Sequence, residues 1–287
     1  MQKILLLASL LFPSLLYAQG LISIKGRIVN EQGEPVEYVH VGMPKKQIGT
    51  VSTYDGRFEL SVPADTLEFH HVAYQSAYFP VVGPREDVLI VMKDAELPPA
   101  VFIGGKTKEK YLLRSGAKLS DSMARGDFYH PDGEVKGIEV GSIANVRKPF
   151  QVKDIFFSVY ANYIPGCVAS INIYRIEGDP ESFVNVLHRP IYFRIVQADT
   201  PKHYDVKPDD VILLDPGRYF IAFAIVDCDA DALRQYQSTP ASERDPLAMH
   251  LFTSIYMKSS YQRDVALGEL RHLPVNIGVA VKGLEYQ

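Results

Sequence analysis

After residue 20 the chain is a succession of short runs in which apolar and polar residues alternate, each run ended by Gly, Pro, Asn or Asp. Alternation with a period of two places the apolar side chains on one face of a β-strand, whereas an amphipathic helix repeats about every 3.6 residues. The dipeptide Asp55-Gly56 separates two such runs and predicts a hairpin turn, because Gly tolerates positive φ. Short helices are expected only within residues 119–124, 230–236 and 241–244. The pattern therefore predicts an all-β fold.

The length of the chain and one pair of prolines predict two domains. A chain of 287 residues exceeds one typical domain of roughly 100–200 residues. Pro98-Pro99 fixes φ and removes backbone donors, so a first β-structure should end before it. We predict a seven-stranded antiparallel β-sandwich over residues 19–95, a linker over 96–115 and a jelly-roll-like β-sandwich over 116–287. The basic residues that we assign to the solvated linker are Lys106, Lys108, Lys110 and Arg114.

A series of motifs runs through the first predicted domain: Gly26-Arg27-Ile28-Val29, Gly33-Glu34-Pro35-Val36, Val39-His40-Val41, Asp55-Gly56-Arg57-Phe58 and Leu67-Glu68-Phe69. Their order and spacing resemble the carboxypeptidase regulatory-like domain, a transthyretin-like β-sandwich found at the front of many exported Gram-negative envelope proteins. The sequence departs from the family pattern at Thr53, where an acidic residue is usual, and at Ala73, where Gly is usual. The resemblance implies a non-catalytic accessory, spacer or assembly module.

The second predicted domain contains motifs such as Ser170-Ile171-Asn172-Ile173-Tyr174 and Pro216-Gly217-Arg218-Tyr219. They resemble the jelly-roll-like domains that follow the same module in uncharacterised envelope proteins, and this resemblance implies no activity. The zinc carboxypeptidase that accompanies the module elsewhere is not expected, because no His is followed three residues later by Glu.

Residues 1–18 have the layout of a secretory signal peptide. Lys3 precedes an apolar run from Ile4 to Leu16, and Ala18 is the predicted last residue removed. The run has about 13 residues, whereas a helix that spans a bilayer needs about 20. No Cys follows the run, so a lipoprotein anchor has no attachment point. We expect an exported protein, periplasmic or secreted, with no transmembrane segment in the mature chain.

The charge of the chain argues against nucleic acid as a partner. Lys and Arg number 30 against 34 Asp and Glu, which gives a net charge of −4. A nucleic-acid backbone is held by a concentrated positive field, which this composition does not supply. We therefore expect no nucleic-acid partner.

Two cysteines and three aspartates are candidates for a covalent link and a metal site. Cys167 and Cys228 could form a disulfide in an oxidising compartment, or could remain separate buried thiols inside strands. Asp227, Asp229 and Asp231 alternate as at the start of a calcium loop, but the Gly and Glu that an EF-hand requires are absent. The three aspartates are therefore a weak metal candidate, and a solvated strand end is the default interpretation.

No motif in the chain identifies a catalytic centre. A Gly-x-Ser-x-Gly sequence and a phosphate-binding loop are both absent. His70 and His71 fall in a predicted strand, so their side chains should face opposite sides and should not converge. We predict no catalytic residue and no cofactor. His203 or His250 in a deep cleft with Asp and Ser or Cys would contradict this expectation.

The function expected is that of a non-catalytic exported envelope protein with an accessory or binding role, in which the second domain makes the specific contacts. One alternative is a glycan-binding module of a polysaccharide-handling system, and another is a hydrolase whose site cannot be read from sequence. The partner is an envelope protein or a glycan. The absence of Trp removes the commonest residue for stacking on sugars. Candidate ligand-facing aromatics are Tyr160, Tyr163, Tyr174, Tyr256 and Tyr261.

Overall fold

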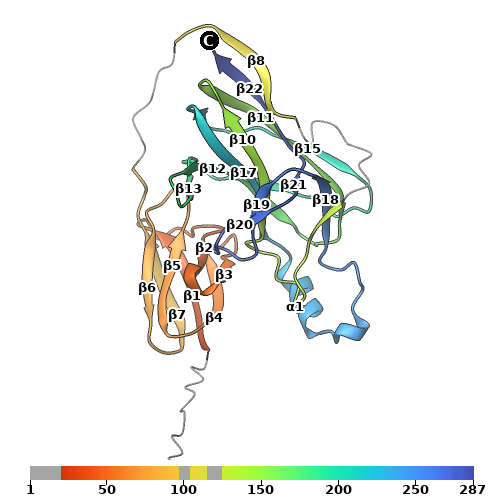
Figure 1. Cartoon of the computed structure of the whole chain (residues 1–287). Coiled ribbons are helices and arrows are strands. Elements are labelled where there is room, and N and C mark those ends of the chain that lie inside the picture. Colours follow the sequence, from red (N-terminus) through yellow and green to blue (C-terminus); the bar gives the residue numbers. More distant parts are fainter. Residues whose placement is uncertain (1–20, 97–103, 115–124) are drawn as a thin grey trace, which may run out of the picture.

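The computed structural model describes residues 21–96, 104–114 and 125–287. They form two β-structured units, a first unit within residues 21–96 and a second unit within residues 104–287, which lie against each other (Figure 1). The predicted all-β fold is confirmed. The predicted signal peptide and the helix expected within 119–124 lie outside the described residues. No helix in the described part of the chain is long and apolar enough to span a membrane.

Two sheets face each other in the first unit, a three-stranded sheet in the order β4-β1-β7 and a four-stranded sheet in the order β3-β2-β5-β6. Their inward side chains form one core, in which the Phe58 and Phe69 rings meet edge to face at 5.3 Å. The elements are β1 (Ile22–Asn30), β2 (His40–Met43), the short 3-10 helix η1 (Pro44–Lys46), β3 (Ile48–Val51), β4 (Arg57–Val62), β5 (Asp65–His70), β6 (Ala77–Val81) and β7 (Arg85–Met92).

Two details of the first unit differ from the sequence prediction. β1 pairs with β7 in parallel, so the sandwich is not wholly antiparallel. The turn at Asp55-Gly56 is present, with Gly56 at φ +78°, but β3 and β4 on either side of it belong to different sheets. Thr53 stabilises this corner, because its Oγ1 accepts a hydrogen bond from Arg57 N at 3.1 Å. The turn therefore links the two sheets instead of closing a hairpin.

The described strands of the second unit form a seven-stranded sheet, in the order β13-β12-β17-β10-β19-β20 with β14 beside β12, and an eight-stranded sheet around β11. The first sheet contains β10 (Glu139–Val146), β12 (Val168–Glu177), β13 (Ser182–Asn185), β14 (Ile191–Arg194), β17 (Gly217–Asp227), β19 (Ser260–Arg263) and β20 (Arg271–Leu273). The second contains β8 (Thr107–Leu113), β9 (Arg125–Phe128), β11 (Phe150–Asn162), β15 (Lys202–Val206), β16 (Ile212–Leu214), β18 (Leu251–Tyr256), β21 (Asn276–Ile277) and β22 (Val279–Tyr286). The helices are α1 (Ala230–Ser238) and the 3-10 turn η2 (Ala241–Glu243), close to two of the predicted short helices.

The core of the second unit lies between its two sheets. Phe157 on β11 stacks on Phe223 on β17 at 4.2 Å, and Phe128 meets Phe223 edge to face at 5.1 Å. Ile171 and Ile173 are fully buried in this core. The other face of the seven-stranded sheet carries Asn172 and Tyr174, as the alternation predicted, and this face bears the candidate site.

The predicted linker is wrong over residues 107–113, which form β8 at the edge of the eight-stranded sheet. β8 pairs antiparallel with β22, and Lys110 and Glu285 form an ion pair across the two strands. Lys282 Nζ lies 2.9 Å from Glu109 Oε2 in the same ladder. Charged residues are common on edge strands because they oppose pairing with other chains. The basic run is therefore the first described strand of the second unit.

The loop between β19 and β20 joins the two units at Ala266. Ala266 is fully buried in a small apolar cluster with Tyr38 and Val51 of the first unit. Gly49 and Gly42 leave room for this loop, since a Cβ on Gly49 would lie 2.0 Å from the Ala266 carbonyl oxygen. Beside them, Gln47 Oε1 accepts a hydrogen bond from Glu269 N at 3.1 Å. The units thus meet in a close backbone contact.

Candidate functional site

A cavity with a volume of 460 Å³ lies between the two units, and we call it the Arg263 cavity. The first unit contributes the end of β5 and the following loop, and the second unit contributes β12, β13 and the end of β19. Ligand sites commonly occupy concave spaces of this size between domains. Lining residues used below are His40, Glu68, His70, His71, Tyr74, Ser170, Tyr174, Val184, Asn185, Tyr192 and Arg263.

A buried ion pair lies at the second unit's wall of this cavity. Glu139 on β10 is directly opposite Arg263 on β19, and Arg263 Nε lies 2.9 Å from Glu139 Oε2. Glu139 is fully buried, and its Oε1 accepts hydrogen bonds from Asn172 Nδ2 at 2.7 Å and Tyr174 Oη at 3.1 Å. Ala224 on β17 is the cross-strand partner of Glu139, and its small side chain leaves room for these contacts. The carboxylate is therefore held by groups from two other strands, β12 and β19.

Arg263 has more donors than partners. The residue is 8% exposed, and its Nε does not form a hydrogen bond of acceptable geometry even with Glu139. Nη1 and Nη2 donate no hydrogen bond to any described residue, while the guanidinium lies 5.5 Å from the Tyr174 ring centre. A guanidinium carries five N–H donors, so those on Nη1 and Nη2 of Arg263 are unused by the described residues. Because Arg263 lines the cavity, these donors are available to a ligand there.

Three histidines of the first unit line the opposite wall. His40 and His70 are cross-strand partners on β2 and β5, and His71 follows directly. His70, which is exposed, faces Ser76, whereas His71, which is buried, faces Tyr192, so the two imidazoles have separate partners although both line the cavity. Burial lowers the pKa of His40 to about 3 and that of His71 to about 4, and the positive charge of Arg263 also lowers the pKa of His40. Burial also lowers the pKa of His70, so at pH 7 the neutral form of all three imidazoles is favoured.

His71 makes the stability of the protein depend on pH. Its Nδ1 accepts a hydrogen bond from Ala73 N at 3.2 Å, and its Nε2 faces Tyr192 Oη of the second unit at 3.2 Å. A pKa that is lowered in the folded state, from 6.5 to about 4, gives stability that is complete above pH 6.5 and is lost as the pH falls toward 4. We expect a loss on the order of 3 kcal/mol from this group.

The prediction is checked by urea unfolding at a series of pH values in the wild type and in His71→Asn, whose side-chain oxygen can still accept from Ala73. The variant should lose the part of the slope between pH 6.5 and 4 that His71 contributes, and the part that remains comes from groups such as His40, whose pKa is also lowered. His188→Gln, at an exposed position, should keep the full slope. An unchanged slope in His71→Asn would contradict the assignment.

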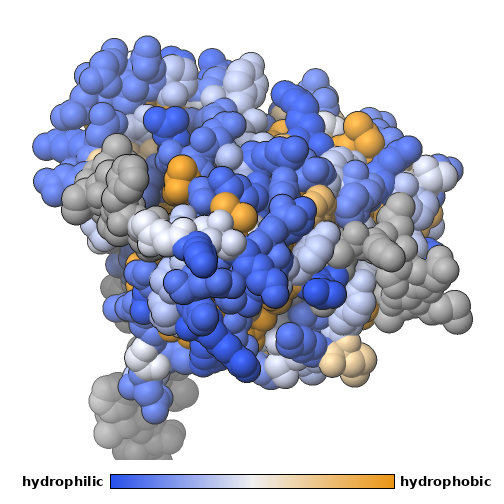
Figure 2. Space-filling model, turned by 90° about the horizontal axis from the view of Figure 1, so that it is seen from above, coloured by the Kyte–Doolittle hydropathy of each residue, from blue (hydrophilic) through white to orange (hydrophobic). Residues whose placement is uncertain are grey.

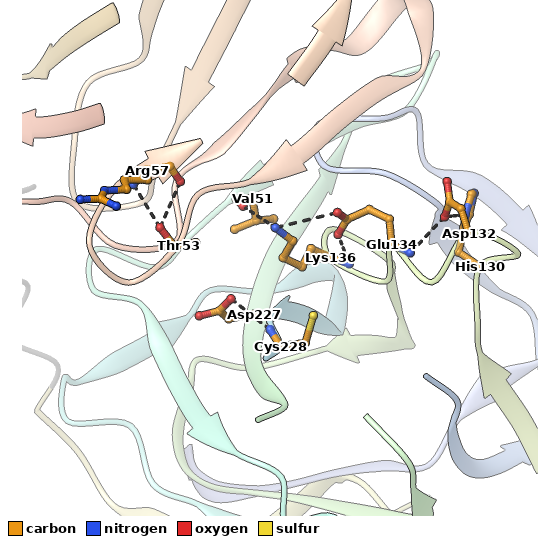
Figure 3. Close-up of polar contacts among 9 residues, drawn as sticks. All are labelled: Val51, Thr53, Arg57, His130, Asp132, Glu134, Lys136, Asp227 and Cys228. Carbon is orange, nitrogen blue, oxygen red and sulfur yellow. Dashed lines mark hydrogen bonds and ion pairs between the residues drawn. The ribbon is translucent and has the colours of Figure 1, made fainter. Parts of the chain in front are cut away.

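A second cavity, of 790 Å³, lies where the first unit meets α1, and we call it the Lys136 cavity. Lys136 Nζ reaches from the second unit to the Val51 carbonyl oxygen at 3.4 Å and lies 3.9 Å from Glu134 Oε2 (Figure 3). On the first-unit side Lys25 Nζ is 2.9 Å from Glu59 Oε1. These charges of the cavity wall already have partners, so the Arg263 cavity is the stronger candidate site.

The five candidate tyrosines do not form one platform. Tyr174 lines the Arg263 cavity, and Tyr261 lies beside it in a small cluster on the same face of the sheet, where its hydroxyl bonds Glu181. Tyr160, Tyr163 and Tyr256 lie on or next to strands of the eight-stranded sheet. Tyr160 has Arg125 stacked 4.6 Å from its ring centre, and Tyr163 contacts Phe252. The structure thus brings only two of the five near the cavity.

Cys167 and Cys228 are both free thiols in the structure. Val168 pairs with Asp227 across β12 and β17, which places the two cysteines opposite each other just beyond the ladder. Both are buried, and burial raises both pKa values, that of Cys228 to about 12. The folded protein should therefore contain two reduced, unreactive thiols.

Ellman's reagent at pH 8 tests this prediction. We expect negligible reaction of the native protein and full reaction of both thiols in denaturant. Prompt labelling of the native protein would contradict the burial of Cys167 and Cys228, and no labelling in denaturant would show that they had formed the disulfide considered from the sequence.

The three candidate metal-ligating aspartates have separate roles. Asp229 Oδ1 accepts a hydrogen bond from Ala232 N at 2.8 Å and so caps the N-terminus of α1, while Asp231 pairs with Arg234 in the same helix. Asp227 Oδ1 accepts from Cys228 N at 3.0 Å (Figure 3). Within the described ranges no group of three or more His, Cys, Asp or Glu residues is arranged to hold a metal ion.

His203 and His250 each have one polar partner. His203 Nδ1 lies 2.9 Å from Ser158 Oγ on the neighbouring strand, and His250 Nδ1 lies 2.8 Å from Asp127 Oδ2. Neither histidine lines the Arg263 cavity or the Lys136 cavity. The arrangement that would have contradicted the non-catalytic expectation, a His in a deep cleft with Asp and Ser or Cys, is not formed by the described residues.

Sequence reasoning missed Glu139, Arg263 and Asn185 as site residues. Asn185 Nδ2 donates to Asn172 Oδ1 at 3.2 Å and so extends the network that ends at Glu139. A signal was present, since Asn172 and Tyr174 alternate with buried isoleucines. What the alternation could not reveal is that this polar face of the second unit lies toward the first unit and not toward open water.

Comparison with known proteins identifies part of the chain. Residues 24–98 match the family model of the CarboxypepD_reg-like domain, which confirms the resemblance inferred for the first unit. No curated protein matches the chain.

Several solved structures are similar to the chain. A DUF3823 family protein from Bacteroides ovatus has 8% identity and a TM-score of 0.21, with 70% of this chain and 95% of that chain covered. Another from Parabacteroides merdae has 9% identity and a TM-score of 0.21, with 90% and 98% covered. A streptococcal ancillary pilin has 9% identity and a TM-score of 0.20, with 74% and 55% covered.

Proposed function

We propose that this protein is a non-catalytic, exported envelope protein that binds a saccharide in the Arg263 cavity. The observation that carries the proposal is the cavity itself, which is bounded by both units and is lined by Arg263, a residue only 8% exposed whose Nη1 and Nη2 donate no hydrogen bond to a described residue. Both units supply polar groups to the wall, and the second unit supplies Arg263. In this view the first unit closes the site.

The composition of the cavity wall supports a saccharide. Aromatic rings, among them Tyr74 and Tyr192, can lie against the C–H faces of a sugar, while Ser170 and Asn185 offer hydrogen bonds to its hydroxyl groups. A mostly apolar wall with a few polar groups is typical of small-molecule sites. This environment lies on the covered face of the sheet, not at the loop ends where a jelly roll usually presents aromatics.

An assembly role is the second candidate, and β7 is the feature that favours it. β7 is an edge strand, and its Leu89 and Val91 are 63% and 49% exposed. The strand begins with Arg85, Glu86 and Asp87, and such charges oppose pairing with another chain. On the face drawn in Figure 2, apolar residues occur in small separate groups on a mainly hydrophilic surface. A saccharide in the cavity therefore remains the first proposal.

A glycan array probed with the chain from residue 21 to 287 tests the proposal. Val184→Trp is the test variant, because Val184 lines the cavity yet is 50% exposed, so the larger side chain narrows the cavity at small cost to folding. Val211→Trp, at a 74% exposed position outside the cavity, is the matched control. We expect Val184→Trp to lose the glycan signals and the control to keep them. Signals equal in both variants, or none in the wild type, would overturn the proposal.

Export is part of the same proposal and has its own test. The layout of residues 1–18 supports it, and the mass of the protein recovered from a secreting host should correspond to a chain that begins at Gln19. An intact N-terminus at Met1 would contradict export by cleavage.

A further inference from the structure

We infer that the Arg263 cavity selects a saccharide that bears a carboxylate, such as a uronic acid, and that Nη1 and Nη2 of Arg263 hold this group. The inference rests on the proposed function and names the ligand class of the same site. It is carried by the geometry of Arg263, whose terminal nitrogens have no hydrogen-bond partner among the described residues of the cavity wall.

The guanidinium of Arg263 is prepared for one more anionic partner. Its Nε side is occupied by Glu139 at 2.9 Å, and the terminal Nη1 and Nη2 donors have no partner among the described residues. A planar guanidinium binds a carboxylate through two parallel N–H···O bonds, and such charge-assisted pairs are among the stronger hydrogen bonds in proteins. Because Arg263 is 8% exposed, a ligand must enter the cavity to reach these donors.

The charges that line the cavity favour a single carboxylate over a more highly charged group. Arg263 is already balanced by Glu139, and Glu68 on β5 adds a further negative charge to the lining. His40, His70 and His71 have lowered pKa values that favour the neutral form at pH 7, so they offer little compensating charge. A phosphate, with nearly two charges, would meet more repulsion than a carboxylate does.

The side chains of the cavity wall favour a sugar as the body of the ligand. Tyr192 and Tyr74 present ring faces and Asn185 presents an amide group, which suit a sugar ring. β2, β5 and β12 reach the cavity with a partner strand on both sides, whereas β13, which also lines it, is the edge strand of its sheet. An extended peptide usually binds by adding a strand to a free sheet edge, so β13 is the place where a peptide would compete.

The inference is tested by calorimetric titration of the chain from residue 21 to 287 with galacturonate, its methyl ester and galactose. These probes differ only at the group that Arg263 is expected to hold. We expect galacturonate to bind at least about tenfold more tightly than the ester or galactose, as one charge-assisted hydrogen-bonded contact provides. The ester tests the carboxylate without any change to the protein, so the result does not depend on a variant that folds poorly.

Arg263→Lys provides the protein arm. Lysine keeps a positive charge beside Glu139 but lacks the planar fork, so the preference for galacturonate over its ester should fall by about tenfold. Circular dichroism should show the variant folded. Asp264→Asn is the control. Asp264 follows Arg263 in the chain but its carboxylate pairs with Arg271, so this variant should keep the wild-type preference.

Each result has a defined meaning. Preference for galacturonate that Arg263→Lys reduces supports the inference. Equal binding of the three probes would overturn the carboxylate contact but leave the cavity as a saccharide site. Tighter binding of a peptide with a free C-terminal carboxylate would overturn the sugar assignment. A third result combines the two experiments: none of the three probes binds, but neutral glycans bind on the array and Val184→Trp abolishes their signals. This result would overturn the inference and keep the proposed function. Cleavage of polygalacturonate by the protein would overturn the part of the proposed function that calls the protein non-catalytic.

Discussion

Replacement of Arg263 by methionine should lower the free energy of unfolding by about 3–5 kcal/mol. The variant would leave the carboxylate of Glu139 in a fully buried position without its ion-pair partner. Asn172 and Tyr174 still donate to that carboxylate, but their hydrogen bonds do not replace the lost positive charge. Urea unfolding followed by circular dichroism measures the effect.

Adding Glu139→Gln to Arg263→Met should restore much of the lost free energy of unfolding. The double variant Glu139→Gln/Arg263→Met keeps an oxygen that accepts from Asn172 and Tyr174 and removes the unpaired charge. Arg218→Met is the matched control, because its ion pair with Glu181 is largely exposed and such pairs contribute about 0–1 kcal/mol. A loss below about 1 kcal/mol in Arg263→Met would contradict the buried ion pair.

Replacement of Gly49 by alanine should separate the two units. The added Cβ would lie 2.0 Å from the Ala266 carbonyl oxygen, so one backbone must move. Gly49 does not have a positive φ, so alanine should fit the backbone of β3 itself. The strain should therefore fall on the contact between the two units. Overpacking of this kind typically costs about 1–3 kcal/mol. We expect one unfolding transition to become two, with loss of ligand binding.

Gly83→Ala is the control for this prediction, because a Cβ at Gly83 meets nothing within 4 Å. It should retain one transition and the wild-type stability within about 0.5 kcal/mol. If Gly49→Ala also retains a single transition, the close contact with Ala266 does not hold the units together.

The first unit was largely predictable because its fold is determined by local signals. Alternating runs and turn glycines located most of its strands, and the motif order indicated the family that residues 24–98 match. The partner of each strand was less predictable. The turn at Asp55-Gly56 indicates a reversal of the chain, but whether its two strands share a sheet depends on contacts across the whole unit.

The candidate site was not predictable, because it depends on the contact between the units. Alternation on β12 correctly separates the isoleucines from Asn172 and Tyr174, and in an isolated sheet the polar face would meet water. Here Asn172 and Tyr174 are both 8% exposed. Arg263 comes next to them only through the pairing of β10 with β17 and β19, far along the sequence.

Residues 107–113 and His71 show two further limits of local reasoning. The lysines of β8 have the composition of a solvated linker, yet the strand is held by pairing with β22 near the end of the chain. His71 was treated as part of a strand, but β5 ends at His70, so His71 lies in the following loop and faces Tyr192 of the second unit. Strand ends are set by tertiary contacts as well as by propensity.

The central claim is that the ligand lies between the two units, and methyl NMR during titration with galacturonate tests it most directly. Shifts should be largest for the methyl groups that line the Arg263 cavity, and galactose should perturb them less. Those residues are Val72, Val184, Leu187, Ile191 and Leu267. Shifts confined to the eight-stranded sheet, for example at Ile255 beside Tyr256, would place the site on that sheet and contradict the account.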